Sequence, residues 1–522
     1  MHPDENDNFT ATGNLREDVV DADIGAVSRE GRTPMGLWHE PNLLIDGELV
    51  AAEGGATFAS VNPATEEVIA EAADASVADV ERAIAAARRA FDETTWSTDA
   101  KFRATCLRQL AAAMRDNLED LRTLTIAEVG VPIGMTSGAA LEGPIEILDY
   151  YADLAEKYET TTDLGLMEAY GGQHRRWIER EPYGVVSAIS AYNYPTQLNL
   201  AKLAPALAAG CTVVLKGAPD TPLITLALGK LIAENTDIPA GVVSVLTSSK
   251  VETGVVMTTD PNVDMITFTG STAVGKAITT AASDTLKKTF LELGGKSACL
   301  VLDDESVDFG VMMAAMATCS HAGQGCAILS RLAVPRDKFD GAVEMAKGMM
   351  EGLNVGDPSD PSNYLGPLIN AKQREKVQAM VDRAVADGAT VVTGGTATDH
   401  EKGFFFKPTL IIGADENSEI AQDEVFGPVL VMFPHDGDDD AVRFANNSKY
   451  GLSGAVMAAD RERALAAARR VRTGTMSVNG GMWHAPDAPF GGYKQSGIGR
   501  ENAVAGLEEF MQTKVFAEPQ AG

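Results

Sequence analysis

The sequence predicts an α/β protein built from two α/β domains, each with a largely parallel sheet at its centre. From about residue 182 onward, short apolar runs rich in valine and isoleucine alternate with helix-like segments, which is typical of βαβ units. The alternation occurs in two stretches, and Gly294-Gly295 lies close to the point where they meet. The chain has 522 residues, more than the roughly 250–300 at which a single hydrophobic core stops growing.

The segment before these stretches is predicted to be a flexible tail followed by a mostly helical region. Residues 1–36 are acidic and polar and contain few large apolar side chains, which is typical of a flexible tail. They also lack the apolar core of a secretory signal. Apolar residues then recur at steps of three and four over 77–91 and again over 101–124, and this spacing predicts amphipathic helices.

Apolar runs of strand length locate the two predicted sheets. We assign residues 37–160 and 183–293 to the first domain and residues 294–495 to the second. The first stretch contains the runs 184–191, 212–216, 241–246, 265–269 and 297–302. The second contains the runs 330–334, 389–392, 409–412, 429–433, 453–458 and 474–478.

Residues 164–181 (LGLMEAYGGQHRRWIERE) are predicted to form a β-hairpin that interrupts the first domain. Two strand-like runs flank Gly171-Gly172, and glycine favours the backbone of a tight hairpin turn. An exposed hairpin edge invites pairing with another chain. We therefore predict that 161–182 and 505–520 form the oligomerisation element of a homodimer or homotetramer. A surface hairpin on a monomer is the alternative.

The composition argues against several classes of partner. The formal net charge is −31, whereas nucleic acids and anionic membranes bind basic surfaces. An acidic surface of this kind keeps a large protein in solution. The chain contains no continuous apolar stretch of about 18 residues, so no transmembrane helix is expected.

The cysteines suggest reduced thiols, one of which could be catalytic. The five residues are scattered and form no C-x-x-C pair: Cys106, Cys211, Cys299, Cys319 and Cys326. Such a set is neither a disulfide framework nor a zinc site, and we predict no metal. A reducing compartment, the cytoplasm, is the expected location. Cys326 lies among the small residues Gly323, Gly325 and Ala327, which leave its sulfur accessible; the alternative is a buried, inert thiol.

Two polar residues follow apolar runs and could assist a nucleophile. Glu292 ends an apolar run just before Gly294-Gly295, where burial would raise its pKa and suit it to act as a general base. Asn193 follows the run 184–191, and an amide at the end of a strand can donate to a developing oxyanion. Each has an ordinary alternative, a surface glutamate at a helix end and a turn asparagine beside proline.

Two further segments could hold a dinucleotide. Gly270, Ser271 and Gly275 follow the run 265–269 and open a helix, where free backbone N–H groups can bind a phosphate. Glu424 and Phe426 lie at a tight turn before the run 429–433, where a ribose and a nicotinamide ring could rest. A plain strand-to-helix turn and an ordinary loop are the alternatives.

Taken together, these segments resemble the aldehyde dehydrogenase family, over residues 43 to 517. The markers occur in the family's order: Asn193, Lys216, Gly270-Ser271-Thr272 with Gly275, Glu292 to Lys296, Gly323 to Cys326, Glu424 to Pro428, and Pro489 to Gly497 running on to Gly499-Arg500-Glu501. The separation of 34 positions from Glu292 to Cys326 also matches the family spacing.

The resemblance implies two Rossmann-like α/β domains, one for the cofactor and one catalytic, with a small β oligomerisation hairpin. It implies that Cys326 attacks an aldehyde, that Asn193 holds the oxyanion, and that Glu292 activates the water that releases the acid. The implied cofactor is NAD, with NADP or dual use open. Its implied binding residues are Lys216, Gly270, Ser271, Gly275, Glu424 and Phe426, and the expected substrate pocket contains Tyr194, Leu198, Ala201 and Trp483.

The sequence departs from the family pattern at three places. Ala191-Tyr192 stands where the family usually has Pro-Trp. Pro219 stands where many NAD-preferring members carry a glutamate, which removes a repulsion toward a 2′-phosphate. NAD is still preferred, because no additional arginine or lysine is evident in that loop. Ala201 stands where many relatives have tryptophan, so a wider pocket is expected.

Two other functions remain as alternatives. In a CoA-acylating semialdehyde dehydrogenase, CoA replaces water as the acyl acceptor, but such relatives generally lack the glutamate that is present here as Glu292. A non-catalytic structural or binding protein on the same scaffold typically loses the thiol or the base. Cys326, Glu292 and Asn193 are all present, so hydrolytic aldehyde oxidation is favoured over both.

Overall fold

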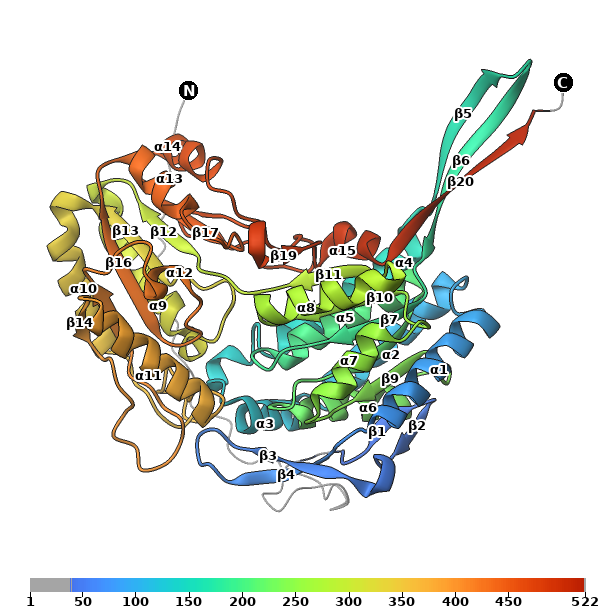
Figure 1. The fold of residues 1–522 in the computed structure, drawn as a ribbon, viewed down its shortest axis with the longest axis horizontal. Helices are drawn as coiled ribbons and strands as arrows, with labels where there is room; N and C mark the ends of the chain where they lie inside the picture. Colours follow the sequence, from blue (N-terminus) through green and yellow to red (C-terminus); the bar gives the residue numbers. More distant parts are fainter. Residues whose placement is uncertain (1–37, 39, 521–522) are drawn as a thin grey trace, which may run out of the picture.

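The computed structural model describes residue 38 and residues 40–520, so the predicted tail of residues 1–36 lies outside the described residues. The described chain forms two α/β domains and a narrow β arm that extends from the first domain (Figure 1). The two mostly parallel sheets confirm the predicted fold class. In the described part of the chain, no helix is long and apolar enough to cross a membrane.

The first domain is organised around an eight-stranded sheet in the order β19-β11-β10-β7-β8-β9-β1-β2. The neighbours from β11 to β9 run parallel, and the strands outside them are antiparallel. Its strands are β1 (Leu43–Ile45), β2 (Glu48–Val50), β7 (Val185–Ile189), β8 (Thr212–Lys216), β9 (Val243–Leu246), β10 (Met265–Thr269), β11 (Lys288–Glu292) and β19 (Gly497–Ile498). A separate antiparallel pair, β3 (Thr57–Val61) and β4 (Val68–Ala73), precedes the first helix.

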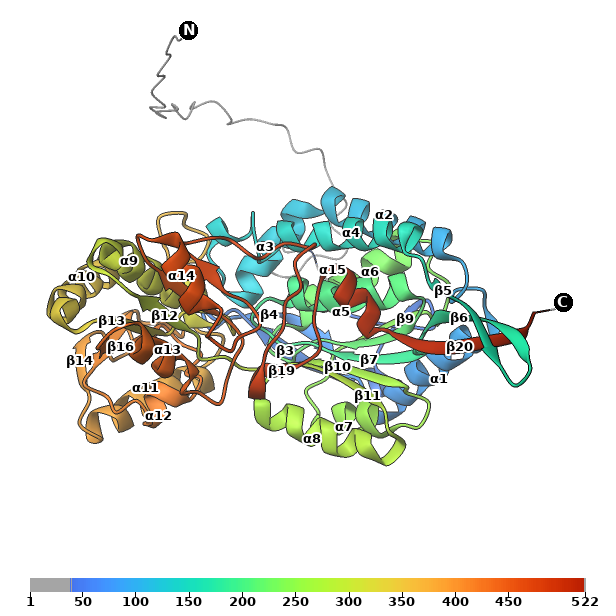
Figure 2. The ribbon, with the colours of Figure 1, turned by 90° about the horizontal axis from the view of Figure 1, so that it is seen from above.

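Helices cover both faces of this sheet, with α2, α4, α5 and α6 on one side and α1, α7 and α8 on the other (Figure 2). They are α1 (Val77–Glu93), α2 (Ala100–Asp116), α3 (Leu118–Val129), α4 (Glu142–Lys157), α5 (Pro195–Ala209), α6 (Pro222–Asn235), α7 (Val251–Thr259) and α8 (Thr272–Ala282). The helical spacing over 101–124 covers two helices, because Asn117 ends α2 and begins α3. Every residue of α5 is buried, so this helix forms the centre of the domain.

The second domain contains a seven-stranded sheet in the order β14-β15-β16-β13-β12-β17-β18, parallel except for β14. Its strands are β12 (Ala298–Val301), β13 (Arg331–Pro335), β14 (Thr390–Thr393), β15 (Thr409–Ile412), β16 (Val429–His435), β17 (Gly454–Met457) and β18 (Ser477–Val478). Its helices are α9 (Val307–Cys319), α10 (Phe339–Glu351), α11 (Ala371–Ala386), α12 (Glu419–Gln422), α13 (Asp438–Asn446) and α14 (Arg461–Ala468).

The structure corrects the grouping of one predicted strand. The run 297–302, grouped with the first stretch, forms β12, which pairs with β13 and β17 of the second sheet. The first sheet is completed instead by β11, which pairs with β10 and ends at Glu292. The apolar pattern missed β11 because its first two residues, Lys288 and Thr289, are polar and partly exposed.

The β arm contains the predicted hairpin and a third strand from the C-terminal segment. The hairpin strands are β5 (Thr161–Ala169) and β6 (Gly172–Pro182), and β20 (Met511–Pro519) pairs antiparallel with β6. Trp177 and Phe516 stack across this pairing with ring centroids 5.2 Å apart. Before β20, the chain passes through β19 and α15 (Ala503–Glu509), both of which contact the first domain. The outer strand β5 is exposed along almost its whole length.

Candidate active site

A cavity of about 500 Å³ brings together side chains from both domains around Cys326. The first domain contributes the end of β7, the start of α5 and the turn after β10. The second contributes the loop of Cys326, the turn at Glu424 and the loop before β19. The residues predicted for the site that line it are Asn193, Tyr194, Leu198, Gly270, Ser271, Cys326, Glu424, Phe426 and Trp483.

Cys326 follows a tight loop in which position 323 has room only for glycine. The loop is left-handed at His321, Ala322 and Gly323, with φ values of 48°, 51° and 76°. A Cβ atom on Gly323 would lie 2.1 Å from the carbonyl of Gly427. Cys326 is also the only one of the five cysteines, all of them described, that is not fully buried. The cavity walls and the nearby carboxylates, Glu292 first among them, raise the pKa of its thiol above the usual range, so a base is needed to generate the thiolate.

Asn193 is held against the cysteine loop by two hydrogen bonds. Its side-chain Nδ2 donates to the carbonyl of Gln324 at 3.0 Å, and its own carbonyl accepts from Nε2 of His321 at 2.9 Å. Burial lowers the pKa of His321 to about 4, so the ring is neutral and Nε2 carries its proton. The second hydrogen on Nδ2 of Asn193 is available to an oxyanion beside Cys326.

Glu292 is a buried carboxylate without a partner. It ends β11 with 3% of its surface exposed, and neither carboxylate oxygen has a hydrogen-bond partner among the described residues. Burial raises its pKa well above the usual range, and the charge of Glu501 adds to this. Glu292 is not among the cavity-lining residues, although the adjacent Leu293 is. Its Oε1 lies beside Gly491, 2.7 Å from where a Cβ atom on that residue would stand.

A buried ion pair that the sequence analysis missed lies behind Glu292. Lys202 of α5 and Glu501 approach to 3.1 Å with their side chains 0% and 2% exposed. Glu501 lines the cavity, whereas Lys202 contacts the ring of Phe290 from 5.8 Å. Glu501 belongs to the last family marker. Lys202 could not be predicted as its partner, because it occurs within an otherwise apolar helix and belongs to no marker.

The turn after β10 has the form of a phosphate site. Ser271 caps α8, since its hydroxyl accepts from the backbone N–H of Val274 at 3.3 Å. A Cβ on Gly270 would lie 2.4 Å from the ring of Phe268, and one on Gly275 would lie 2.6 Å from the side chain of Leu293. Both glycines therefore permit close packing around the start of α8. Gly270 and Ser271 line the cavity there, and the N-terminus of a helix favours a phosphate.

Glu424 and Phe426 form the opposite wall. Glu424 accepts a hydrogen bond from the N–H of Gly295 at 2.9 Å, which ties the second domain to the segment that links the two sheets. Burial raises the pKa of Glu424 to about 7. Phe426 has a left-handed backbone with φ of 58°, and its ring meets that of Tyr192 edge to face at 5.8 Å.

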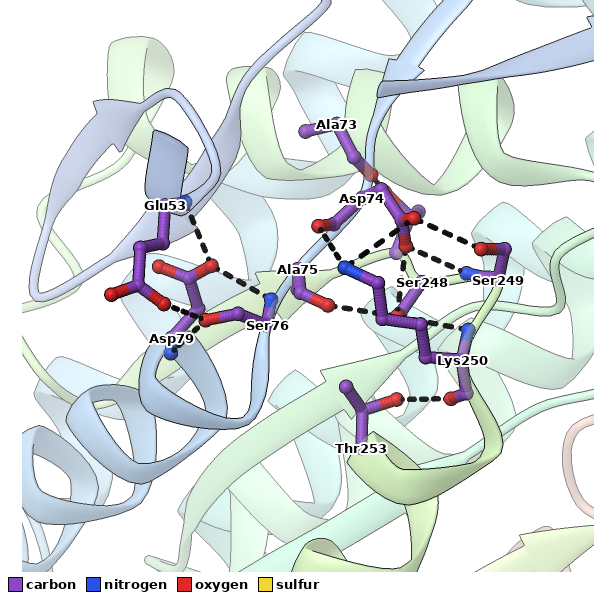
Figure 3. Close-up of polar contacts among 11 residues, drawn as sticks. Glu53, Ala73, Asp74, Ala75, Ser76, Asp79, Ser248, Ser249, Lys250 and Thr253 are labelled. Carbon is purple, nitrogen blue, oxygen red and sulfur yellow. Dashed lines mark hydrogen bonds and ion pairs between the residues drawn. The ribbon is translucent and has the colours of Figure 1, made fainter. Parts of the chain in front are cut away.

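Lys216 ends β8 outside the cavity-lining set, and the charge of Asp74 acts on its ammonium group. Figure 3 shows the polar contacts of Asp74 with Ser248, Ser249 and Lys250. Among the described residues, the one hydrogen bond of the Lys216 Nζ is to the carbonyl of Gly217 at 3.5 Å, and burial lowers the pKa of this lysine to about 8. Asp74 accepts hydrogen bonds from Ser248 and Ser249 and lies 3.5 Å from Nζ of Lys250. The parallel strands β8 and β9 are neighbours, so Lys216 and Lys250 lie at the same sheet edge. Lys250 was missed because it occurs 34 residues later in the sequence.

Three of the four residues expected in the substrate pocket line the cavity. Tyr194 lies edge to face with His321, with ring centroids 5.1 Å apart, and Trp483 stacks on Phe490 at 5.4 Å. Leu198 also lines the cavity. Ala201 does not: it is fully buried one turn further along α5, because the cavity meets only the first turn of that helix. Gln197 and His484, which the sequence analysis did not select, do line the cavity.

Comparisons with known proteins agree with this geometry. The model of the aldehyde dehydrogenase family matches residues 49–516. An aldehyde dehydrogenase of Enchytraeus buchholzi is 36% identical over 90% of this chain and 94% of its own. A geranial dehydrogenase of Castellaniella defragrans is 35% identical over 91% of this chain and 98% of its own.

Solved structures are similar over the same extent. A betaine aldehyde dehydrogenase of Staphylococcus aureus in complex with NAD⁺ gives a TM-score of 0.88 at 34% identity, covering 92% of this chain and 94% of that one. An aldehyde dehydrogenase of Mycobacterium tuberculosis complexed with NAD⁺ gives 0.87 at 38% identity, covering 91% and 97%. The chain therefore belongs to the aldehyde dehydrogenase family, as an NAD(P)-dependent oxidoreductase that acts on aldehydes.

Proposed function

We propose that the enzyme oxidises its aldehyde to a free carboxylic acid, with Cys326 as nucleophile, Asn193 as oxyanion donor and Glu292 as general base. The observation that carries this proposal is the 3.0 Å hydrogen bond from Nδ2 of Asn193 to the carbonyl of Gln324 in the cysteine loop. It is supported by Glu292, whose carboxylate oxygens have no hydrogen-bond partner among the described residues. Residues 37–160 and 183–293 would bind the cofactor, and residues 294–495 would supply the nucleophile.

The residues around the cavity fit a dinucleotide cofactor. Lys216 is buried and has no carboxylate partner within 4 Å among the described residues, so it suits a ribose hydroxyl. The turn at Gly270 and Ser271, at the start of α8, suits a pyrophosphate. Glu424 would hold the second ribose, and Phe426 would support the nicotinamide. When bound, the cofactor accepts the hydride. We propose NAD, because both structural neighbours named above contain NAD⁺.

The chain's own residues account for the other steps. Glu292 takes the proton of the Cys326 thiol and passes it to solvent, and the thiolate sulfur forms a bond to the aldehyde carbon. The Nδ2 of Asn193 and the N–H of Cys326 stabilise the oxyanion. Loss of hydride from this adduct leaves a thioester on Cys326. Glu292 rotates toward the cavity and takes a proton from water, which attacks the thioester and frees the acid.

The test compares Cys326→Ala with Cys319→Ala, a buried thiol of the second domain. Cys326→Ala is expected to abolish NADH formation over a panel of aldehydes and to leave cofactor binding nearly intact. Cys319→Ala is expected to retain activity in its folded fraction. Undiminished oxidation by Cys326→Ala would contradict the assignment. Release of acyl-CoA in preference to free acid would favour the CoA-acylating alternative.

Acceptance of a 2′-phosphate on the cofactor, which distinguishes NADP from NAD, can be tested separately. Lys250 adds a cation near Lys216, and Pro219 carries no charge to repel a phosphate, so we propose that NADP is also accepted. Lys250→Gln is expected to lower kcat/KM for NADP severalfold more than for NAD. Equal effects on both cofactors would remove Lys250 from this role.

We also propose a homodimer or homotetramer assembled through the β arm, residues 161–182 and 505–520. Its support is the exposed outer strand β5, which offers unpaired backbone groups. The five free cysteines fit a reducing cytoplasmic location. Sedimentation of the full chain and of a variant lacking residues 511–522 tests the assembly.

A further inference from the structure

Two amide side chains of α5 lie two residues apart but differ in their hydrogen bonding. Asn199 is satisfied: its Oδ1 accepts from Ser190 at 2.6 Å, and its Nδ2 donates to Thr225 at 3.1 Å. Gln197 lines the cavity with 8% of its surface exposed, and its Oε1 has no partner among the described residues. A buried amide without a partner is costly, so this position points to a ligand group.

The rest of the substrate side carries no net charge for a charged substrate to pair with. Of the described residues that line the cavity, the only lysine is Lys376, whose Nζ donates to the carbonyl of Glu424 on the cofactor side. Glu501 is paired with Lys202. Burial lowers the pKa of His484, so this imidazole is neutral near pH 7.

Apolar and aromatic side chains make up most of the remaining wall, with Ser320 as a further polar residue. Tyr194 and Leu198 come from the start of α5, Trp483 and Phe490 form a stacked pair, and Ile328 follows the cysteine loop. Such a surface stabilises an aromatic or branched apolar body through burial. A single polar group on that body would meet Gln197.

We propose that the substrate is an uncharged aldehyde with an aromatic or branched apolar body and one hydroxyl group, which Gln197 recognises. A hydroxyl both donates and accepts, so it pairs with either end of the amide. This inference rests on the proposed function, since it concerns the aldehyde that reacts at Cys326. Gln197 acts on selectivity and is not a catalytic residue.

The test uses aldehydes that differ by one atom. The 3- and 4-(hydroxymethyl)benzaldehydes are compared with 3- and 4-ethylbenzaldehyde in wild type and in Gln197→Leu. In at least one ring position, wild type is expected to prefer the hydroxyl compound by about tenfold or more in kcat/KM. Gln197→Leu is expected to lose this preference while oxidising the ethyl compound at least as well.

Leu198→Met is the matched control, because it alters the neighbouring wall without changing its polarity. It is expected to affect both members of each pair alike. A preference that Gln197→Leu leaves unchanged at both ring positions would overturn the inference. This is the result expected if the Gln197 amide binds only water. So would faster oxidation of 4-carboxybenzaldehyde or betaine aldehyde than of every neutral compound. Failure of wild type to oxidise any aldehyde would instead contradict the proposed function.

Discussion

Glu128 and Glu292 are both fully buried carboxylates of the first domain, but their surroundings differ completely. Glu128, near the end of α3, accepts hydrogen bonds from the backbone of Leu223 at 2.6 Å and of Ile224 at 2.9 Å, at the start of α6. It also accepts one from the hydroxyl of Ser60 at 2.9 Å. Glu292 has no partner at either oxygen among the described residues. Burial raises the pKa of Glu128 to about 7, and that of Glu292 well above its usual range.

This comparison shows that a raised pKa by itself does not identify a general base. Glu128 joins α3, β3 and α6, and its oxygens are occupied, so it has no free acceptor to offer a substrate. Neither oxygen of Glu292 has a hydrogen-bond partner among the described residues, so both can still accept a proton, as the proposed general base requires. The following predictions test this division, starting from the largest effect.

Glu292→Gln is expected to slow hydrolysis of the thioester by about 10²–10⁴-fold, because an amide cannot take the proton of water. Intact mass measured after mixing with aldehyde and NAD should show acyl-enzyme on Cys326. Glu128→Gln is the control, since it makes the same chemical change at the other carboxylate. Full turnover by Glu292→Gln without an accumulating thioester would remove Glu292 as the base.

The rate of hydrolysis is expected to rise with pH up to the raised pKa of Glu292. The base must be ionised, so the rate should fall about tenfold for each pH unit below that pKa. Single-turnover decay of a preformed thioester, measured from pH 5 to 9, checks the dependence. In Glu292→Gln the rate should no longer rise with pH over this range. A rise that persists in this variant would show that another group is the base.

Glu128→Gln is expected to lower the free energy of unfolding by about 1–3 kcal/mol, because an amide NH₂ would face one of the two N–H donors of α6. Activity per folded molecule should remain near normal. Urea denaturation combined with active-site titration measures both, and Glu119→Gln on the exposed face of α3 is the control. A large loss of kcat with an unchanged urea midpoint would give Glu128 a catalytic role instead.

Glu128 should also make stability depend on pH in a defined direction. Its pKa rises from 4.5 to about 7 on folding, so the folded state binds more protons between these values. Stability contributed by this group is therefore full below about pH 4.5 and declines as pH rises toward about 7. The difference in Tm between wild type and Glu128→Gln, followed from pH 5 to 8, should shrink as pH rises.

Ser60→Ala is expected to have the smallest effect, about 1 kcal/mol, because Glu128 keeps its two backbone donors. Thermal unfolding measures it, with the exposed Ser137→Ala as a control that should change little. An effect larger than that of Glu128→Gln would show that Ser60 stabilises the fold through other contacts.

Much of the fold could be predicted because its signals are local. Buried parallel strands are typically continuous apolar runs, and nine of the predicted runs correspond to interior strands of the two sheets within a few residues. The hairpin was found from Gly171-Gly172, since the turn requires left-handed backbone, with φ of 51° at Tyr170 and 79° at Gly171. β11 was missed because polar residues begin it, and its assignment depends on pairing with β10.

The candidate site was predictable to the extent that single segments carry it. Cys326, Asn193, Ser271 and Glu424 each lie on a short marker whose order along the chain is distinctive, and the structure gathers them around one cavity. Ala201 was expected there because many relatives have tryptophan at this position, but the cavity meets only the first turn of α5.

The sequence by itself determined the α/β class, the family and the chemical residue types, since these depend on local periodicity and on motifs within short segments. Only the tertiary structure decided which distant groups share an environment. It pairs Lys202 with Glu501 across 299 residues and occupies Glu128 with backbone donors 95 and 96 residues away. It also leaves Glu292 and Gln197 without partners among the described residues. Burial and electrostatics act through space, so the charge and reactivity of a side chain follow from neighbours that chain order does not reveal.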